Sequence, residues 1–87
     1  MILKFLNKKN DEIEIIKGSN KENINKAMND YLNKIKFKSY YTRINFESEK
    51  RVIIDYGSHS EFFIVESEND KENMFEIFGF RIDKLTN

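Results

Sequence analysis

The chain has 87 residues, is 39% hydrophobic and 34% charged, and has a formal net charge of zero. This length predicts one domain, residues 1–87, with a thin core, because a domain this small buries only about 60 to 65% of the surface that its unfolded chain exposes. The chain has no cysteine and only a short apolar start, which excludes thiol chemistry, a disulfide scaffold, a signal peptide and a membrane span, so we expect a cytoplasmic protein.

The first part of the chain predicts a hairpin followed by a helix. Two short apolar runs, residues 2–6 and 13–16, are separated by a polar, turn-prone segment, which is typical of a β-hairpin. Further on, apolar residues recur at the spacing of an amphipathic helix, and they are Ile24, Ala27, Met28, Tyr31, Leu32 and Ile35. Ser19 is the expected N-cap of this helix, with Glu22 reaching back to the Ser19 amide.

From residue 39 the apolar period changes from helical spacing to two, which indicates β-strands. The inward-facing residues of the first strand are expected to be Tyr40, Thr42, Ile44 and Phe46. Residues 51–56 run back as a second strand, and residues 61–66 form a third strand after the turn at 57–60. These segments predict three antiparallel strands in sequence.

A second helix is expected after the last of these strands. Asn69 is the predicted N-cap, with Glu72 at the third helical position. The apolar face of this helix would consist of Met74, Phe75, Ile77 and Phe78. Gly79 is a natural helix terminator, and residues 80–85 fit either a final strand or a continued helix. The fold class is therefore α+β, in the order ββαβββα.

The densest polar cluster, residues 55–61, contains His59, the single histidine of the chain. Nucleophilic or acid–base chemistry requires groups from separate elements, whereas this cluster lies in one turn and its flanks. We interpret it as a structural turn and expect a protein that is not an enzyme. One histidine, no cysteine and three scattered glycines form neither a metal motif nor a phosphate loop, so no catalytic residue, metal or cofactor is expected.

The charges of the chain are divided unevenly between its halves. Residues 1–43 carry ten Lys and Arg against five Asp and Glu, whereas residues 44–87 carry five against ten, which gives charges of +5 and −5. In the basic half, lysines and an arginine alternate with aromatic residues in the set Lys34, Lys36, Phe37, Lys38, Tyr40, Tyr41 and Arg43. A nucleic-acid-binding regulator is therefore the alternative function, although the zero net charge favours lysines that only complement the helix dipole.

The acidic half concentrates its charge in residues 61–76, where six carboxylates face one lysine. Carboxylates at a helix start account for Asp70 and Glu72, but they account less well for Glu66 and Glu68. An exposed acidic ridge could bind a basic groove on a partner, including a groove built for nucleic acid. The predicted partner-binding residues are Glu61, Glu66, Glu68, Asp70 and Glu72, with Phe63 as an aromatic anchor.

Strand alternation is the reason for including Phe63. If Phe62 and Ile64 face the core, Phe63 and Val65 face the other way, beside Ile53 and Tyr41. Such a face is too apolar to be simply solvated. It is either covered by the N-terminal hairpin or the C-terminal segment, or it is an interface, including one through which the chain oligomerises.

Residues 63–69, with the sequence FIVESEN, close the predicted strands and lead into the second helix. This stretch resembles the corresponding part of a family of small phage anti-CRISPR proteins that inhibit a type II CRISPR effector nuclease. The resemblance implies an acidic, DNA-mimicking surface that occupies the site where the nuclease reads its short duplex motif. Its implied contacts are Glu66, Glu68, Asp70 and Glu72. The chain differs from the family in its N-terminal hairpin, where the family has a helix, and in its neutral charge.

These observations together predict a binding protein of phage or mobile-element origin. The Lys-, Ile- and Asn-rich composition, without Pro, Cys or Trp, is what A/T-rich codons produce and indicates a low-GC bacterium or its phage. We expect a non-catalytic inhibitor whose partner is a host nucleic-acid-handling protein, such as a CRISPR effector, in the cytoplasm of a bacterial cell. Direct binding of nucleic acid is the less favoured alternative, and the oligomeric state is left open.

Overall fold

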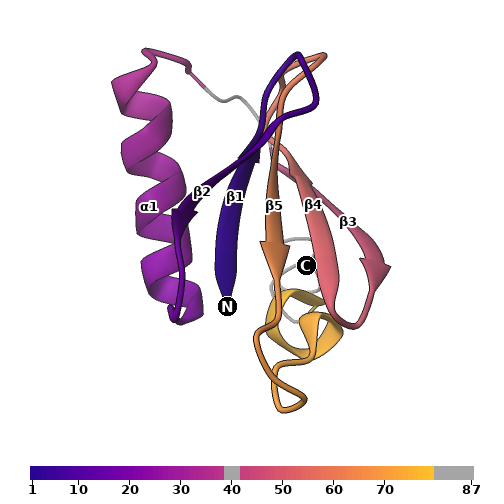
Figure 1. Ribbon diagram of the computed structural model, residues 1–87. Coiled ribbons are helices and arrows are strands. Elements are labelled where there is room, and N and C mark those ends of the chain that lie inside the picture. Colours follow the sequence, from indigo (N-terminus) through magenta and orange to yellow (C-terminus); the bar gives the residue numbers. More distant parts are fainter. Residues whose placement is uncertain (39–41, 80–87) are drawn as a thin grey trace, which may run out of the picture.

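The computed structural model describes residues 1–38 and 42–79, and it has the predicted ββαβββα order (Figure 1). The elements are β1 (Ile2–Leu6), β2 (Glu12–Ile16), α1 (Lys21–Lys34), β3 (Arg43–Ser48), β4 (Arg51–Asp55) and β5 (Phe62–Glu66), followed by a second helical segment at residues 74–79. The α+β prediction is thereby confirmed. Residues 80–85, which fitted a strand or a helix, lie outside the described residues, as do Tyr40 and Tyr41.

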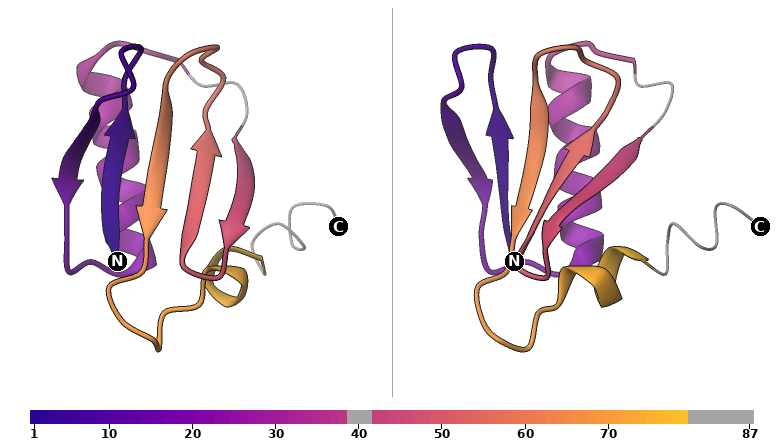
Figure 2. Two further views of the ribbon diagram at one scale, coloured as in Figure 1. Left: turned by 45° about the vertical axis from the view of Figure 1, so that its right-hand side comes forward. Right: turned by 90° about the vertical axis from the view of Figure 1, so that its right-hand side faces the viewer.

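The five strands in the described part of the chain belong to one antiparallel sheet with the order β2-β1-β5-β4-β3. β1 joins the predicted N-terminal hairpin to the three later strands, because it pairs with β2 on one side and with β5 on the other. In the β1–β5 register, Phe5 lies opposite Phe63 and Leu3 lies opposite Val65. Helix α1 covers one face of the sheet, and the second helical segment lies at the end of the sheet where the chain begins (Figure 2).

The core lies between α1 and the sheet. It consists mainly of Leu3, Phe5, Val52, Ile54, Tyr56, Phe63 and Val65 from the sheet side, Ile24, Met28 and Leu32 from α1, and Met74 and Phe78 from the second helical segment. Aromatic rings fill its centre, where the ring of Phe63 lies 5.5 Å from that of Phe5 and 5.1 Å from that of Tyr56. Each fully buried side chain of this size contributes about 1.5 to 3 kcal/mol through removal from water.

The predicted facing of β5 is wrong. Phe63 and Val65 point toward α1 and have no exposed surface, so they form neither an outer apolar face nor an interface. Ile64 lies on the opposite face and is also fully buried, with Lys4 and Ile53 as its cross-strand neighbours. Alternation misassigned the faces because β5 is an interior strand with three consecutive buried residues, and such a strand carries little period-two signal.

Both predicted helix starts are also displaced. Asn20, not Ser19, is the N-cap of α1: its backbone is extended (φ −92°, ψ 175°) and its side chain accepts a hydrogen bond from the Asn23 amide at 2.9 Å. The Ser19 amide instead donates to the Met1 carbonyl, which ties this residue to the sheet end. The side-chain oxygen of Asn20, one residue later, then accepts from the Asn23 amide in the first turn of the helix.

The second helical segment begins at residue 74, so Asn69 is not its N-cap. Asn73 has that role, because its side chain accepts from the amides of Phe75 and Glu76 at 2.9 and 3.3 Å. Asn69 stabilises the preceding turn by accepting from the Lys71 amide. Asparagine is favoured both at helix N-caps and in turns, so Asn69 and Asn73 are equally suitable by residue type. The turn at residues 69–71 uses Asn69 and leaves Asn73 as the N-cap.

Helix α1 ends in a Schellman motif. The Phe37 amide donates to the Leu32 carbonyl at 2.9 Å, and the Lys36 amide donates to the Asn33 carbonyl at 3.2 Å. Lys36 occupies the left-handed position of this motif with φ +58°, where glycine is the usual residue. Ile35, predicted on the apolar face, is the C-cap residue and is 41% exposed.

Candidate protein-binding surfaces

The loop at residues 67–73 projects beyond the end of the sheet and contains most of the predicted acidic site (Figures 1 and 2). Its two ends are fixed to the turn between β3 and β4. The Ser67 amide donates to the Lys50 carbonyl at 2.9 Å, and the Met74 amide donates to the Glu49 carbonyl at 2.7 Å. The loop is therefore held in one position relative to the sheet.

The amino group of Met1 lies between two carboxylates of this loop. It is 2.9 Å from Glu68 Oε1 and 3.0 Å from Glu72 Oε2, and it also donates to the Ser19 carbonyl. Glu68 Oε1 accepts a further hydrogen bond from the Gly18 amide, and Glu72 Oε1 accepts from the Glu68 amide. We call this arrangement the amino-terminal clamp; it pins the loop to the start of the sheet.

The clamp shifts the pKa of each of its members. The hydrogen bond from the Met1 amino group, followed by that from the Gly18 amide, lowers the pKa of Glu68. The backbone hydrogen bond from the Glu68 amide, with the contact to the amino group, lowers the pKa of Glu72. Burial disfavours the charged amino group of Met1, but the hydrogen bonds and charges of the two carboxylates outweigh it and raise its pKa.

Glu66 belongs to a second network, on the sheet face opposite α1. It accepts from Lys4 at 2.7 Å and from Arg51, and Arg51 in turn binds Glu47 at 2.9 Å. Glu12 completes the row through Lys4 at 3.2 Å. The hydrogen bond from Lys4, opposed by burial and reinforced by Arg51, lowers the pKa of Glu66. Glu66 is therefore committed to contacts within the domain.

Two of the remaining predicted residues differ sharply in exposure. Asp70 is fully exposed at the loop and has one exposed contact, with the Lys50 ammonium at 3.1 Å. Phe63 is buried at the centre of the core and cannot serve as an interface anchor in this fold. Glu61, at the start of β5, is partly buried, and its amide donates to the Ser58 hydroxyl.

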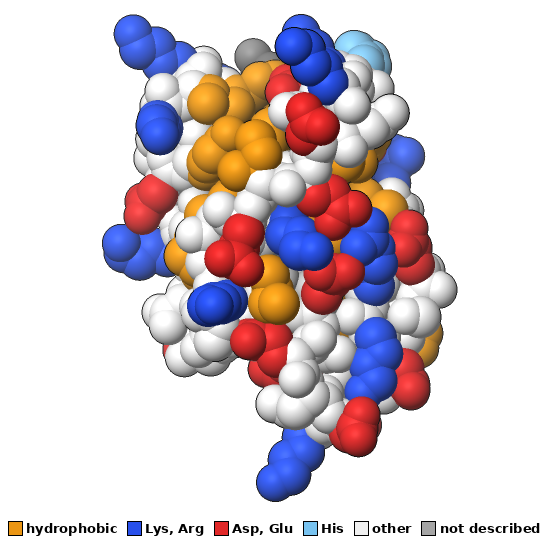
Figure 3. Space-filling view, in the orientation of Figure 1, with side chains coloured by type: hydrophobic (Ala, Val, Ile, Leu, Met, Phe, Trp, Pro, Cys, Tyr) orange, Lys and Arg blue, Asp and Glu red, His pale blue; other side chains and the backbone are white. Residues whose placement is uncertain are grey.

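The surface around these carboxylates carries both charge signs. Acidic and basic side chains are interspersed on the face shown in Figure 3, and an apolar patch lies above them. The structure brings Glu66, Glu68 and Glu72 to one end of the sheet and sets cations beside each of them. The acidic ridge is reduced to the exposed part of the loop, around Asp70, and to exposed Glu76 beyond it.

The polar cluster at residues 55–61 uses its side chains to form a turn. Asp55 accepts from the Gly57 amide at 2.9 Å, and the Ser58 hydroxyl accepts from the amides of Ser60 and Glu61. Gly57 has φ +104°, a conformation that other residues rarely adopt. Within residues 1–38 and 42–79, no three histidine or acidic side chains are grouped so as to hold a metal ion.

In the predicted nucleic-acid-binding surface, the lysines are exposed but one of the aromatic residues packs against the core. Lys34, Lys36 and Lys38 are exposed at the end of α1. Phe37 between them packs edge-on against Tyr56, with 4.9 Å between ring centroids, so it is a core residue and not a stacking platform. Arg43 is the exposed first residue of β3.

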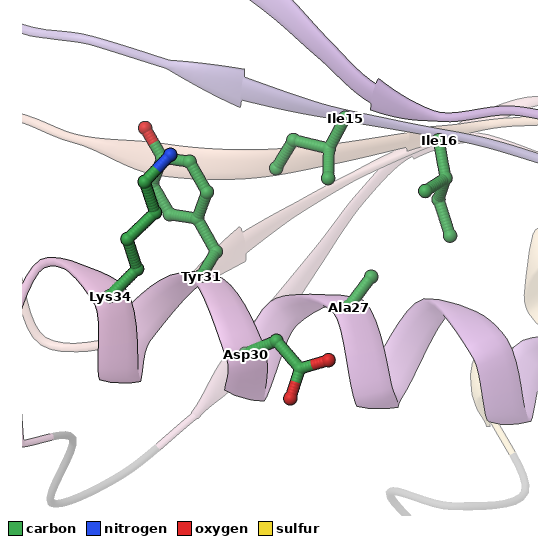
Figure 4. A pocket seen from close by; sticks show the side chains of 6 residues that line it. All are labelled: Ile15, Ile16, Ala27, Asp30, Tyr31 and Lys34. Carbon is green, nitrogen blue, oxygen red and sulfur yellow. The ribbon is translucent and has the colours of Figure 1, made fainter.

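A groove between α1 and β2 was not predicted as a site. It has a volume of about 290 Å³ and is lined by Ile15, Ile16, Ala27, Asp30, Tyr31 and Lys34 (Figure 4). The available signal was the pair of adjacent isoleucines, which a regular strand would point to opposite faces. A bulge in the β1–β2 register allows both to point toward α1.

Comparisons with protein-family models, with curated proteins and with solved structures gave no match to this chain. Neither helix in the described part of the chain has the length and hydropathy that a membrane span requires.

Proposed function

We propose that this chain is a non-catalytic phage or mobile-element protein that binds and inhibits a host nucleic-acid-handling protein, with a type II CRISPR effector as the most specific candidate. The observation that carries the proposal is the projecting acidic loop at residues 67–73, which is fixed at both ends and exposes Asp70 at its surface. A loop that is already ordered loses little conformational entropy on binding.

The electrostatics of the loop support a basic partner. The lowered pKa values keep Glu68 and Glu72 ionised well below neutral pH. Clefts that bind nucleic acid are lined with Lys and Arg, and they attract an opposing row of carboxylates over a distance of about one Debye length, roughly 8 to 10 Å. The proposed contacts are the exposed carboxylates Asp70 and Glu76. Glu68 and Glu72 add negative charge beside them but, like Glu66, are paired within the domain and are left out of the contact set.

The test replaces exposed carboxylates that belong neither to the amino-terminal clamp nor to the network around Glu66. A double variant, Asp70→Asn with Glu76→Gln, removes two negative charges, one from the loop and one just beyond it. Among residues 1–38 and 42–79 it breaks a single ion pair, the exposed contact of Asp70 with Lys50. Target-duplex cleavage by a purified type II effector would be measured with increasing inhibitor. We expect the double variant to lose inhibition while its free energy of unfolding, measured by urea titration, stays within about 0.5 kcal/mol of the wild type.

A matched control removes the same charge far from the loop. Asp11→Asn with Asp30→Asn should inhibit like the wild type, since Asp11 lies in the β1–β2 turn at the opposite end of the sheet and Asp30 lies beyond the middle of α1. Equal inhibition by the loop variant and the wild type would contradict the proposed surface. Absence of any protein partner, together with salt-dependent binding of oligonucleotides by the wild type, would favour the alternative function through Lys34, Lys36 and Lys38 instead.

A further inference from the structure

β2 is an edge strand whose outer side is available for pairing. It pairs with β1 alone among the described strands, so alternate amides and carbonyls along its outer side have no strand partner in the part of the chain that the structure describes. Exposed strand edges are templates for the addition of another strand. This edge also retains an exposed apolar side chain, because Ile13 is 45% exposed.

The groove beside this edge is placed to receive side chains of an added strand. Ile15 and Ile16 point from β2 toward α1, and Ala27 and Tyr31 form the helix side (Figure 4). Ile13 lies on the same side of β2, since its register partner Phe5 is in the core. A strand paired with β2 would therefore direct every second side chain over apolar surface between the sheet edge and α1.

The other face of the same edge is acidic. Glu12 and Glu14 lie there, opposite Leu6 and Lys4 in the β1–β2 register. Glu12 already contacts Lys4 and Arg51, but Glu14 is exposed and forms no ion pair with any residue in the ranges 1–38 and 42–79. The remaining side chains of an added strand would be next to these carboxylates, where basic residues are favoured.

We propose that β2 and the α1–β2 groove bind an extended segment of a partner protein in which apolar residues alternate with Lys or Arg. The backbone of the segment pairs with β2, its apolar side chains enter the groove, and its basic side chains meet Glu14 and Glu12. A second copy of this chain fits less well. The fully overlapped antiparallel pairing of two β2 strands places Glu14 of one copy directly opposite Glu14 of the other, and like charges in that position are destabilising.

The test uses a short capped peptide in which lysine alternates with valine, titrated into isotope-labelled full-length protein and followed by backbone amide shifts. We expect saturable shifts in residues 12–16 and along the groove side of α1, and weaker binding of a matched peptide with glutamate in place of lysine. Glu14→Lys should weaken the binding of the lysine peptide by about threefold or more. This variant should also bind the glutamate peptide better than the wild type does.

Glu49→Lys is the control, because it makes the same charge change on an exposed side chain in the β3–β4 turn. It should bind the lysine peptide within about twofold of the wild type. Shifts confined to the loop at residues 67–73, equal effects of the two variants, or no saturable binding would overturn the proposal. Shifts in β2 that depend on protein concentration without peptide would assign the edge to a second copy. The proposed inhibitory function is tested separately, since neither substitution alters Asp70 or Glu76.

Discussion

Lys36→Gly is expected to stabilise this protein, although the substitution removes a whole side chain. Lys36 has φ +58° at the end of α1, and its amide closes the Schellman motif by donating to the Asn33 carbonyl. A left-handed backbone costs a residue with a Cβ about 1 to 2 kcal/mol, whereas glycine adopts it freely. Glycine loses about 0.5 to 1 kcal/mol more backbone entropy on folding.

The difference between these two contributions predicts a gain of about 0.5 to 1 kcal/mol in the free energy of unfolding, or about 2 to 8 °C in the melting temperature of a domain of this size. The Lys36 side chain is exposed, so its loss offsets little of this gain. Urea unfolding followed by circular dichroism gives the midpoint, and an unchanged slope would show that the unfolded state is comparable.

Lys26→Gly provides the matched control. The residue type and the substitution are the same, but Lys26 is an exposed residue in the interior of α1, where glycine costs about 1 kcal/mol relative to good helix formers. The two variants should therefore shift the urea midpoint in opposite directions. If both lower it by similar amounts, the left-handed conformation at Lys36 is not the determinant and the reasoning fails.

Three further predictions concern the charge networks and the core. Glu66→Gln removes a carboxylate that accepts hydrogen bonds from two cations. The free energy of unfolding at neutral pH, measured by urea titration, should fall by about 1 to 2 kcal/mol. An unchanged midpoint would contradict a stabilising role for this network. Because the folded-state pKa values of Glu66, Glu68 and Glu72 are lowered, their stabilisation is present above the usual glutamate value of about 4.3 and is lost as the pH falls through the lower folded values. The urea midpoint should therefore fall on acidification below about pH 4.5, and less steeply in Glu66→Gln than in the wild type. Phe63→Ala should cost about 3 to 5 kcal/mol, seen as a large drop in melting temperature, and a loss below about 1 kcal/mol would contradict its place in the core.

The elements of this fold were predictable because each depends on neighbours in sequence. Residues 2–6 and 13–16 form the expected hairpin, and the helical spacing from Ile24 to Leu32 marks the buried side of α1. Cap positions were less accurate. Ser19 and Asn69 have the right chemistry for caps, but their backbone or side-chain groups are used by the β2–α1 connection and by the turn before residue 74.

The sequence predicted which carboxylates lie near the candidate site, but not which of them are free of partners within the domain. The sequence correctly concentrates carboxylates near the end of β5, but it contains no sign that Glu66 meets Lys4 and Arg51. Nor does it show that Glu68 and Glu72 enclose the Met1 amino group, since these partners are far apart along the chain. The apolar groove beside β2 likewise depends on a bulge and on the position of α1.

The sequence by itself determined the class of this protein: a small, cysteine-free α+β domain with a hairpin, an amphipathic helix and three further strands. Only the tertiary structure decided that β1 pairs with β5, which merges these strands into one sheet and leaves β2 at its edge. Local periodicity cannot specify a pairing between distant segments, and a strand buried on both faces gives no alternation from which to orient it. That pairing buried Phe63, placed Lys4 beside Glu66, and left Asp70 and the outer edge of β2 available to a partner.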